Sequence, residues 1–141
     1  MSRNYSHGLC LSILLSSLLV LSPVSAKDIK LGGEQKDKLA PNIVVLPVIA
    51  VMIRTEDGGW KHIKIDAWLS GTDADNARKL DGLKHQIITK ADHEIPNRNY
   101  ETLQSPAQGT KEAKRIIHEA VEAGLGHEWK GEVLIHNMMV Y

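Results

Sequence analysis

The chain has 141 residues, and its 17 basic residues balance its 17 acidic residues to a formal net charge of zero. This balance argues against a nucleic-acid partner, and the single cysteine, Cys10, excludes an internal disulfide or a cluster of thiolate ligands. A chain of this length can bury roughly 60–70% of its unfolded surface, which is enough for one modest domain.

The first 26 residues have the order of a secretory signal peptide. Arg3 gives a positive start, residues 9–21 are almost wholly apolar, and small residues lead to Ala26 before the charge returns. The alternative is an uncleaved anchor, which needs about 20 apolar residues. We expect cleavage after Ala26 and a periplasmic or secreted protein, with Cys10 removed. Contact with a membrane is expected only if this segment is retained.

An arm and two strands are predicted next. Residues 27–42 are charged and contain a glycine pair, which is typical of a flexible arm or linker. Residues 43–54 (IVVLPVIAVMIR) predict a strand buried on both faces, with a bulge or an edge position at Pro47 because proline lacks an N–H. Residues 56–59 (EDGG) predict a hairpin turn into the next strand.

The strand predicted over residues 60–69 alternates strictly and should pair antiparallel with the first. One face carries Ile63, Ile65, Ala67 and Leu69, and the other carries His62, Lys64, Asp66 and Trp68. Trp68 either packs over the sheet edge or the arm, or anchors a protein partner. His62 and Asp66 could form an acid–base pair, although their spacing is ordinary on a solvated strand and no catalytic motif surrounds them.

Two helices should follow. Residues 72–93 repeat apolar residues every three or four positions, and Thr72 with Asp75 resembles a capping box at the start. Gly82 predicts a turn that is frayed or closely packed. Pro96 ends this helix, and residues 94–104 are predicted to be a connector. The apolar residues of this helix are Ala77, Leu80, Leu83, Ile87 and Ala91.

The second helix has clear start and stop signals. Ser105 and Gln108 fit another capping box with Pro106 at the first helical position, and Gly124 and Gly126 offer left-handed caps at the end. Residues 132–141 (EVLIHNMMVY) predict a last strand. The order strand, strand, helix, helix, strand predicts one α+β domain over residues 43–141, with helices on one face of an antiparallel or mixed sheet.

The strongest candidate for metal chemistry lies in the last predicted strand. His136 with the two methionines after it could ligate a soft metal such as copper. Alternation places His136 and Met138 on one face and Met139 on the other, and no recognised ligand spacing is present. We therefore predict no catalytic residue, cofactor or metal site. A periplasmic metal- or small-ligand-binding module that uses His136 and Met138 is the alternative function.

Five patterns follow one another in the predicted domain. They are residues 63–69 (IKIDAWL), 80–88 (LDGLKHQII), 100–103 (YETL), Gly109 before 111–117 (KEAKRII), and 133–141 (VLIHNMMVY). In this order they resemble the periplasmic domain of the FliL-like proteins associated with the flagellar basal body. The resemblance implies a small non-enzymatic α+β domain, similar to stomatin-type domains, that forms oligomers and supports the motor's stator.

Members of that family usually keep a single membrane anchor, whereas the N-terminal segment here carries a cleavage pattern. A soluble periplasmic relative is therefore expected. We predict an exported protein-interaction domain whose partner is a second copy or another protein, with stator and basal-body components as candidates. The terminal strand should lie at a sheet edge, where unpaired backbone groups can recruit another chain, so contact is expected through residues 60–69 or 133–141.

Overall fold

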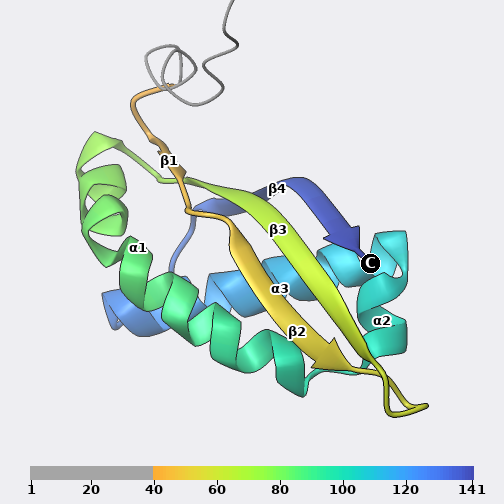
Figure 1. The fold of residues 1–141 in the computed structure, drawn as a ribbon. Coiled ribbons are helices and arrows are strands. Elements are labelled where there is room, and N and C mark those ends of the chain that lie inside the picture. The colour runs from red at the N-terminus through yellow and green to blue at the C-terminus, as the bar shows by residue number, and fades with distance from the viewer. Residues whose placement is uncertain (1–39) are drawn as a thin grey trace, which may run out of the picture. The chain divides into compact units, whose positions relative to one another are not determined.

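The computed structural model describes residues 40–141, and the predicted signal peptide and most of the predicted arm lie outside them. A four-stranded antiparallel sheet has helices on one face (Figure 1), which confirms the predicted α+β class. The strands are β1 (Ile43–Val45), β2 (Ile49–Arg54), β3 (Trp60–Ser70) and β4 (Glu132–Val140). The helices are α1 (Ala74–Glu94), the 3-10 helix η2 (Ile95–Asn97), α2 (Tyr100–Gln104) and α3 (Pro106–Leu125). None of these helices has the length and hydropathy that a membrane span requires.

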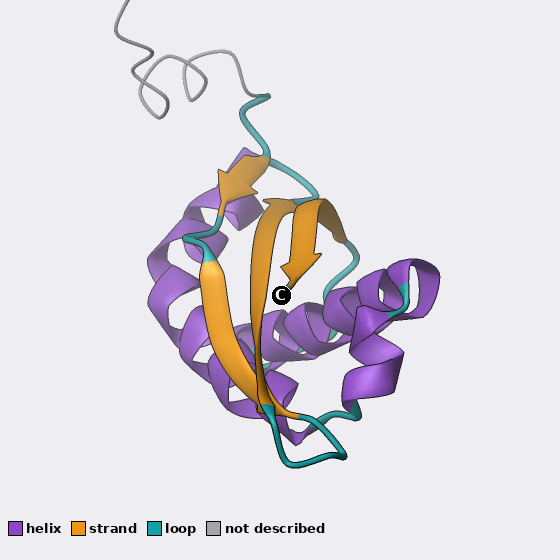
Figure 2. Cartoon of the chain, turned by 45° about the vertical axis from the view of Figure 1, so that its right-hand side comes forward, coloured by secondary structure: helices purple, strands orange, loops and turns teal. Residues whose placement is uncertain are grey.

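The longest strand, β3, forms the centre of the sheet (Figure 2). Its two ends pair with β1 and β2 along one side, and β4 pairs along the other. Ile65, for example, lies between Ile49 of β2 and Met138 of β4. Within residues 40–141, β4 therefore forms one outer edge of the sheet, as predicted, whereas β3 has no outer edge.

Pro47 divides the first predicted strand into β1 and β2. The backbone N–H of Leu46 still bonds the carbonyl of Ala67 at 3.1 Å, but Pro47 and Val48 are exposed and unpaired in the ladder. Both pieces lie on the edge position expected for a proline-bearing strand. The expected burial on both faces is wrong: residues of β2 alternate between buried and exposed because the helices cover only one face.

The hairpin and the alternating strand agree with the prediction. The N–H of Thr55 bonds the carbonyl of Gly59 at 2.9 Å, and Gly58 has a φ of 85°, a left-handed conformation that favours glycine. On β3 all four predicted inward residues are buried. They are Ile63, Ile65, Ala67 and Leu69.

The structure corrects the predicted capping of the helices and the predicted connector. Asp73 caps α1, because its carboxylate accepts the backbone N–H of Asn76 at 2.8 Å, so the box predicted from Thr72 is wrong. Ser105 precedes α3 without a side-chain capping bond, so the second predicted box is also wrong. The predicted connector contains α2, which Asn99 caps.

Of the other predicted helix signals, some are confirmed and some are wrong. Pro106 begins α3 as predicted, and Gly126 ends it with a φ of 74°. Gly124 lies inside α3 rather than at its cap. At Gly82 the helix α1 is continuous, and an added Cβ would meet nothing within 4 Å, so this turn is neither frayed nor closely packed.

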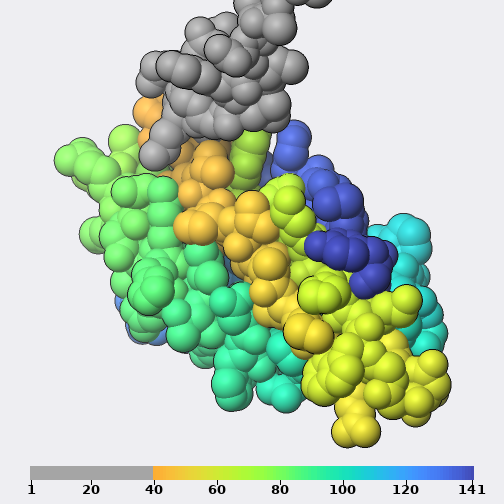
Figure 3. Space-filling model, viewed as in Figure 1, coloured from red at the N-terminus to blue at the C-terminus, as the bar shows by residue number. Residues whose placement is uncertain are grey.

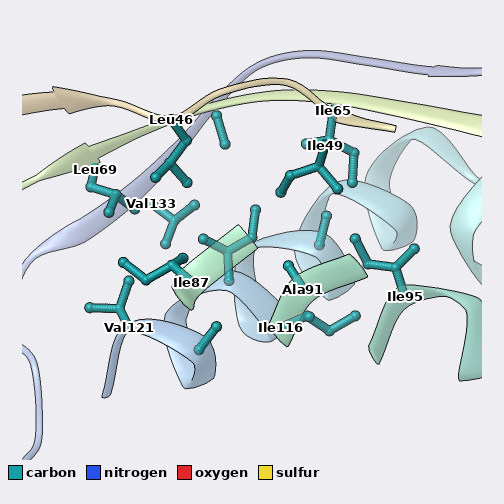
Figure 4. Close-up of a cluster of buried hydrophobic side chains, with 14 of the residues drawn as sticks. Leu46, Ile49, Ile65, Leu69, Ile87, Ala91, Ile95, Ile116, Val121 and Val133 are labelled. Atoms are coloured by element: carbon teal, nitrogen blue, oxygen red, sulfur yellow. The ribbon is translucent and has the colours of Figure 1, made fainter. Parts of the chain in front are cut away.

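The hydrophobic core fills the space between the sheet and the two long helices (Figure 4). Isoleucine dominates it, and no polar or charged residue of the described chain is buried. Trp129, after α3, is 3% exposed and donates its Nε1–H to Asn76 at 3.1 Å. This bond joins the loop after α3 to the first turn of α1, and it satisfies the polar atom that a buried indole carries.

Candidate functional site

The sheet face opposite the helices is the first candidate surface, and we call it the open face. Residues that alternate with the buried ones point to this side, and cross-strand partners share it. In Figure 3, atoms of β2, β3 and β4 form the middle of the visible surface, with α1 and α2 at its two sides. The open face carries Ile43, Val45, Ala50, Met52, Arg54, Trp60, His62, Lys64, Asp66, Trp68, Ser70, Glu132, Leu134, His136, Asn137, Met139 and Tyr141.

Trp68 is the half-buried aromatic residue of this face. It lies between Val45 of β1 and Leu134 of β4 in the ladder, and its ring stacks on His136 with centroids 5.0 Å apart and planes 4° apart. The helix layer covers the opposite side of the strand. One flank of the indole is therefore fixed by neighbours while the outer flank remains accessible.

A second stack lies near the hairpin end of the open face. His62 stacks on Tyr141 with centroids 5.6 Å apart, and its ladder partner on the other side is Met52. Exposure is high here: Tyr141 is 63% exposed and Trp60 is 60% exposed. The predicted acid–base partner Asp66 lies further along β3, opposite Asn137, and His62 uses its ring for the stack.

A β-bulge in β4 changes the faces predicted for the metal candidates. Ala67 pairs with Ile135 and Asp66 pairs with Asn137, so His136 is an extra residue on β4. After it the alternation is inverted. Met138 therefore packs against the core while His136 stacks on the open face, and the expectation that these two share a face is wrong.

Metal chemistry gains no support from the described residues. In residues 40–141 no three His, Cys, Asp or Glu side chains converge to hold a metal ion. The carboxylates with shifted pKa values have local causes elsewhere. The Arg115 guanidinium lowers the pKa of Glu112, and the Thr55 hydroxyl lowers that of Asp57 in the hairpin.

The second candidate surface is a groove beside β4 that sequence reasoning missed. Its volume is about 390 Å³, and it lies between β4 and the corner where α2 meets α3. Its walls combine apolar residues with uncharged polar ones and one histidine: Leu103, Pro106, Ile135, Met138 and Val140, then Gln104, Ser105, Thr110 and Asn137, and His136. The two walls are far apart in the sequence, and one of them belongs to a stretch predicted to be a connector. The cap signal of Asn99 before residues 100–103 could have revealed the short helix.

Comparison with known proteins finds no family model that matches the chain and no curated protein that matches it. The likeness to FliL-like proteins therefore stays a prediction from the residues.

Proposed function

We propose that this protein is a non-enzymatic protein-interaction domain that binds its partner through the open face. The observation that carries the proposal is Trp68, which lies half-buried and stacked on His136 on a sheet face that no helix of residues 40–141 covers. Tryptophan is enriched among the residues that dominate binding energy at protein interfaces. A partner that covers Trp68 would remove its remaining accessible surface from water.

The surroundings of Trp68 fit an interface better than a solvated surface. Val45 and Leu134 flank Trp68 in the ladder. Met52 and Met139, which lie further along the open face, are 48% and 41% exposed. Charged side chains lie on the same face: Lys64 and Asp66 on the central strand, Arg54 on β2 and Glu132 on β4. An apolar patch with a few polar groups is the usual composition of a protein-binding surface.

Export and the flagellar association belong to the same proposal. The N-terminal signal pattern supports a domain that works in the periplasm or outside the cell. The resemblance of residues 43–141 to FliL-like domains makes stator or basal-body components, or a second copy of this chain, the candidate partners. No nucleic acid and no cofactor enters this proposal.

Trp68→Ala tests the open face. Truncation of an interface hot spot costs about 1–4 kcal/mol of binding free energy, so association should weaken while the fold is retained. Sedimentation over a range of concentrations measures self-association. Pull-down of stator and basal-body components from the native host, quantified by mass spectrometry, measures binding to other proteins. Lys90→Ala on the exposed side of α1 is the control.

The circular dichroism spectrum of each variant shows whether it has folded. Association equal to wild type in a folded Trp68→Ala protein would contradict the proposal. Unfolding of that variant would assign Trp68 to the core instead and would also overturn it. The control should match wild type in both measurements, because it lies on the helix side of the domain.

A further inference from the structure

The outer edge of β4 presents unpaired backbone groups. Tyr141 exchanges two backbone hydrogen bonds with His62, at 2.8 and 3.0 Å. Hydrogen-bonded and non-hydrogen-bonded pairs alternate along an antiparallel ladder. Val140 and Met138 therefore turn their N–H and C=O groups away from β3, toward the outer edge. In residues 40–141 no other strand pairs with this edge.

The last part of the edge, residues 138–140, also lacks the usual protection against pairing. Exposed edge strands commonly carry lysine, other charges or proline, which discourage another strand from adding. Residues 133–141 (VLIHNMMVY) contain none of these, and the bulge at His136 lies before the segment 138–140. This segment is consequently able to accept a strand.

The groove described above runs beside the same edge. Val140 and Met138 line it with their side chains and face the added strand with their backbone. Leu103 and Pro106 form the opposite wall. A strand that paired with β4 would point every second side chain toward the helix layer, and hence into this groove.

The chemistry of the groove specifies its occupant. No Asp, Glu, Lys or Arg lines it, and His136 is the one titratable residue in its walls. Its volume of about 390 Å³ falls within the range of roughly 300–1,000 Å³ typical of ligand pockets. A charged side chain would lose hydration here without gaining an ionic partner, so uncharged side chains fit best.

We propose that β4 binds an extended segment of a partner protein as an additional antiparallel or parallel strand, with uncharged side chains at alternate positions in the groove. Main-chain hydrogen bonds supply affinity in this mode of recognition, and the pocket supplies specificity. This inference rests on the proposed interaction function and adds a second surface to it.

The shape of the edge favours a peptide strand over a second copy. Figures 1 and 2 both show α2 and the start of α3 lying beyond β4 on the helix side of the sheet. A second copy that offered its own β4 would bring an identical α2–α3 corner to the same place. The two corners would compete for one space, whereas an isolated strand has no helix layer.

A peptide library tests the inference without knowledge of the partner. The probe is a phage-displayed library of random linear nine-residue peptides, panned on the protein recovered after expression of the full 141-residue sequence. Enriched peptides should carry uncharged residues at alternate positions. The most enriched peptide is then synthesised with a fluorescent label, and its affinity is measured by anisotropy.

Two matched substitutions distinguish peptide binding in the groove from peptide binding elsewhere on the surface. Gln104 and Gln108 are both exposed, but only Gln104 lines the groove. Gln104→Trp should block the groove and weaken peptide binding about tenfold or more, as expected for loss of a central contact, whereas Gln108→Trp should change it by less than about twofold. N-methylation of alternate peptide residues should abolish binding in one register and spare it in the other, because only one set of N–H groups faces β4.

Several results would overturn the inference. These are an absence of enrichment, equal affinity for both tryptophan variants, or equal effects of the two N-methylation registers. Dimers that dissociate in Gln104→Trp without any peptide would assign the edge to a second copy. Peptide binding that appears only after residues 27–39 are deleted would assign it to the chain's own segment. If peptide binding fails while Trp68-dependent association persists, the groove inference falls and the proposed function stands.

Discussion

At the scale of single residues, Gly109 shows how tightly the α2–α3 corner is built. A Cβ at this position would lie 2.2 Å from the carbonyl oxygen of Leu103, far inside contact distance. The backbone N–H of Gly109 also bonds the carbonyl of Ser105 at 2.7 Å. The missing side chain is therefore what lets the first turn of α3 approach α2, and this approach shapes one wall of the groove.

Gly109→Ala should destabilise the domain, and Gly82→Ala should stabilise it. The first change overpacks the corner, which costs about 1–3 kcal/mol of unfolding free energy. The second replaces a helix-interior glycine at which an added Cβ meets nothing within 4 Å, which should contribute up to about 1 kcal/mol. Urea titrations of both variants and wild type measure these changes. Unchanged stability in Gly109→Ala would refute this account of the corner, and a loss of stability in Gly82→Ala would contradict the open space at that position.

At the scale of elements, the start of α1 depends on one carboxylate. The hydrogen bond from the Asn76 backbone, with a smaller contribution from the Thr72 hydroxyl, holds the pKa of Asp73 below its ordinary value of 3.8. The folded state therefore binds fewer protons than the unfolded state near this pH. The stabilisation is present above pH 3.8 and is lost as the pH falls through the folded-state pKa.

Substitution of this cap should remove a part of the acid sensitivity. Asp73→Asn and Asp73→Ser still cap the helix but do not titrate. The melting temperature of each variant, measured from pH 6 to pH 2 (a span of about four units that brackets the titration of carboxylates), should fall less steeply than that of wild type. An identical slope in wild type and both variants would show that the Asp73 carboxylate does not contribute to it.

The elements also show what periodicity can and cannot predict. Alternation located β3 and its inward residues, and helical spacing located α1 and α3, because each pattern reports which face meets the core. The break at Pro47 was visible as a proline, but its outcome depended on pairing with β3. The extra residue His136 changes the faces of the residues after it, and no local pattern in β4 marks where a ladder bulges.

At the scale of the whole molecule, the candidate surfaces differ in how far the sequence predicts them. Trp68 was placed on the outward side of β3 by alternation alone. The groove was not predicted, because its walls, residues 103–110 and 135–140, meet only after the helices have crossed the sheet. Its lining also has no motif, since apolar side chains at such positions look like ordinary core residues.

A measurement of metal binding by the whole molecule distinguishes the proposed protein-interaction function from the metal-binding alternative. His136 and Met138 point to opposite sides of the sheet, and no three potential ligands converge in residues 40–141. The protein should therefore bind Cu²⁺ or Zn²⁺ no more tightly than scattered surface histidines do. Calorimetry with wild type and His136→Ala should give the same weak isotherms. A one-to-one, sub-micromolar site that disappears in His136→Ala would restore the metal-binding alternative.

The central position of β3 affects the order in which the sheet can form during synthesis or export. β2 and β3 pair across a short loop. The other side of β3 pairs with β4, which is the last described element and follows all the helices in the sequence. Such distant pairing makes closure of the sheet a late event. A chain that emerges N-terminus first from a ribosome or a translocation pore exposes one side of β3 until β4 has come through, so the sheet cannot be completed before residues 132–140 are available.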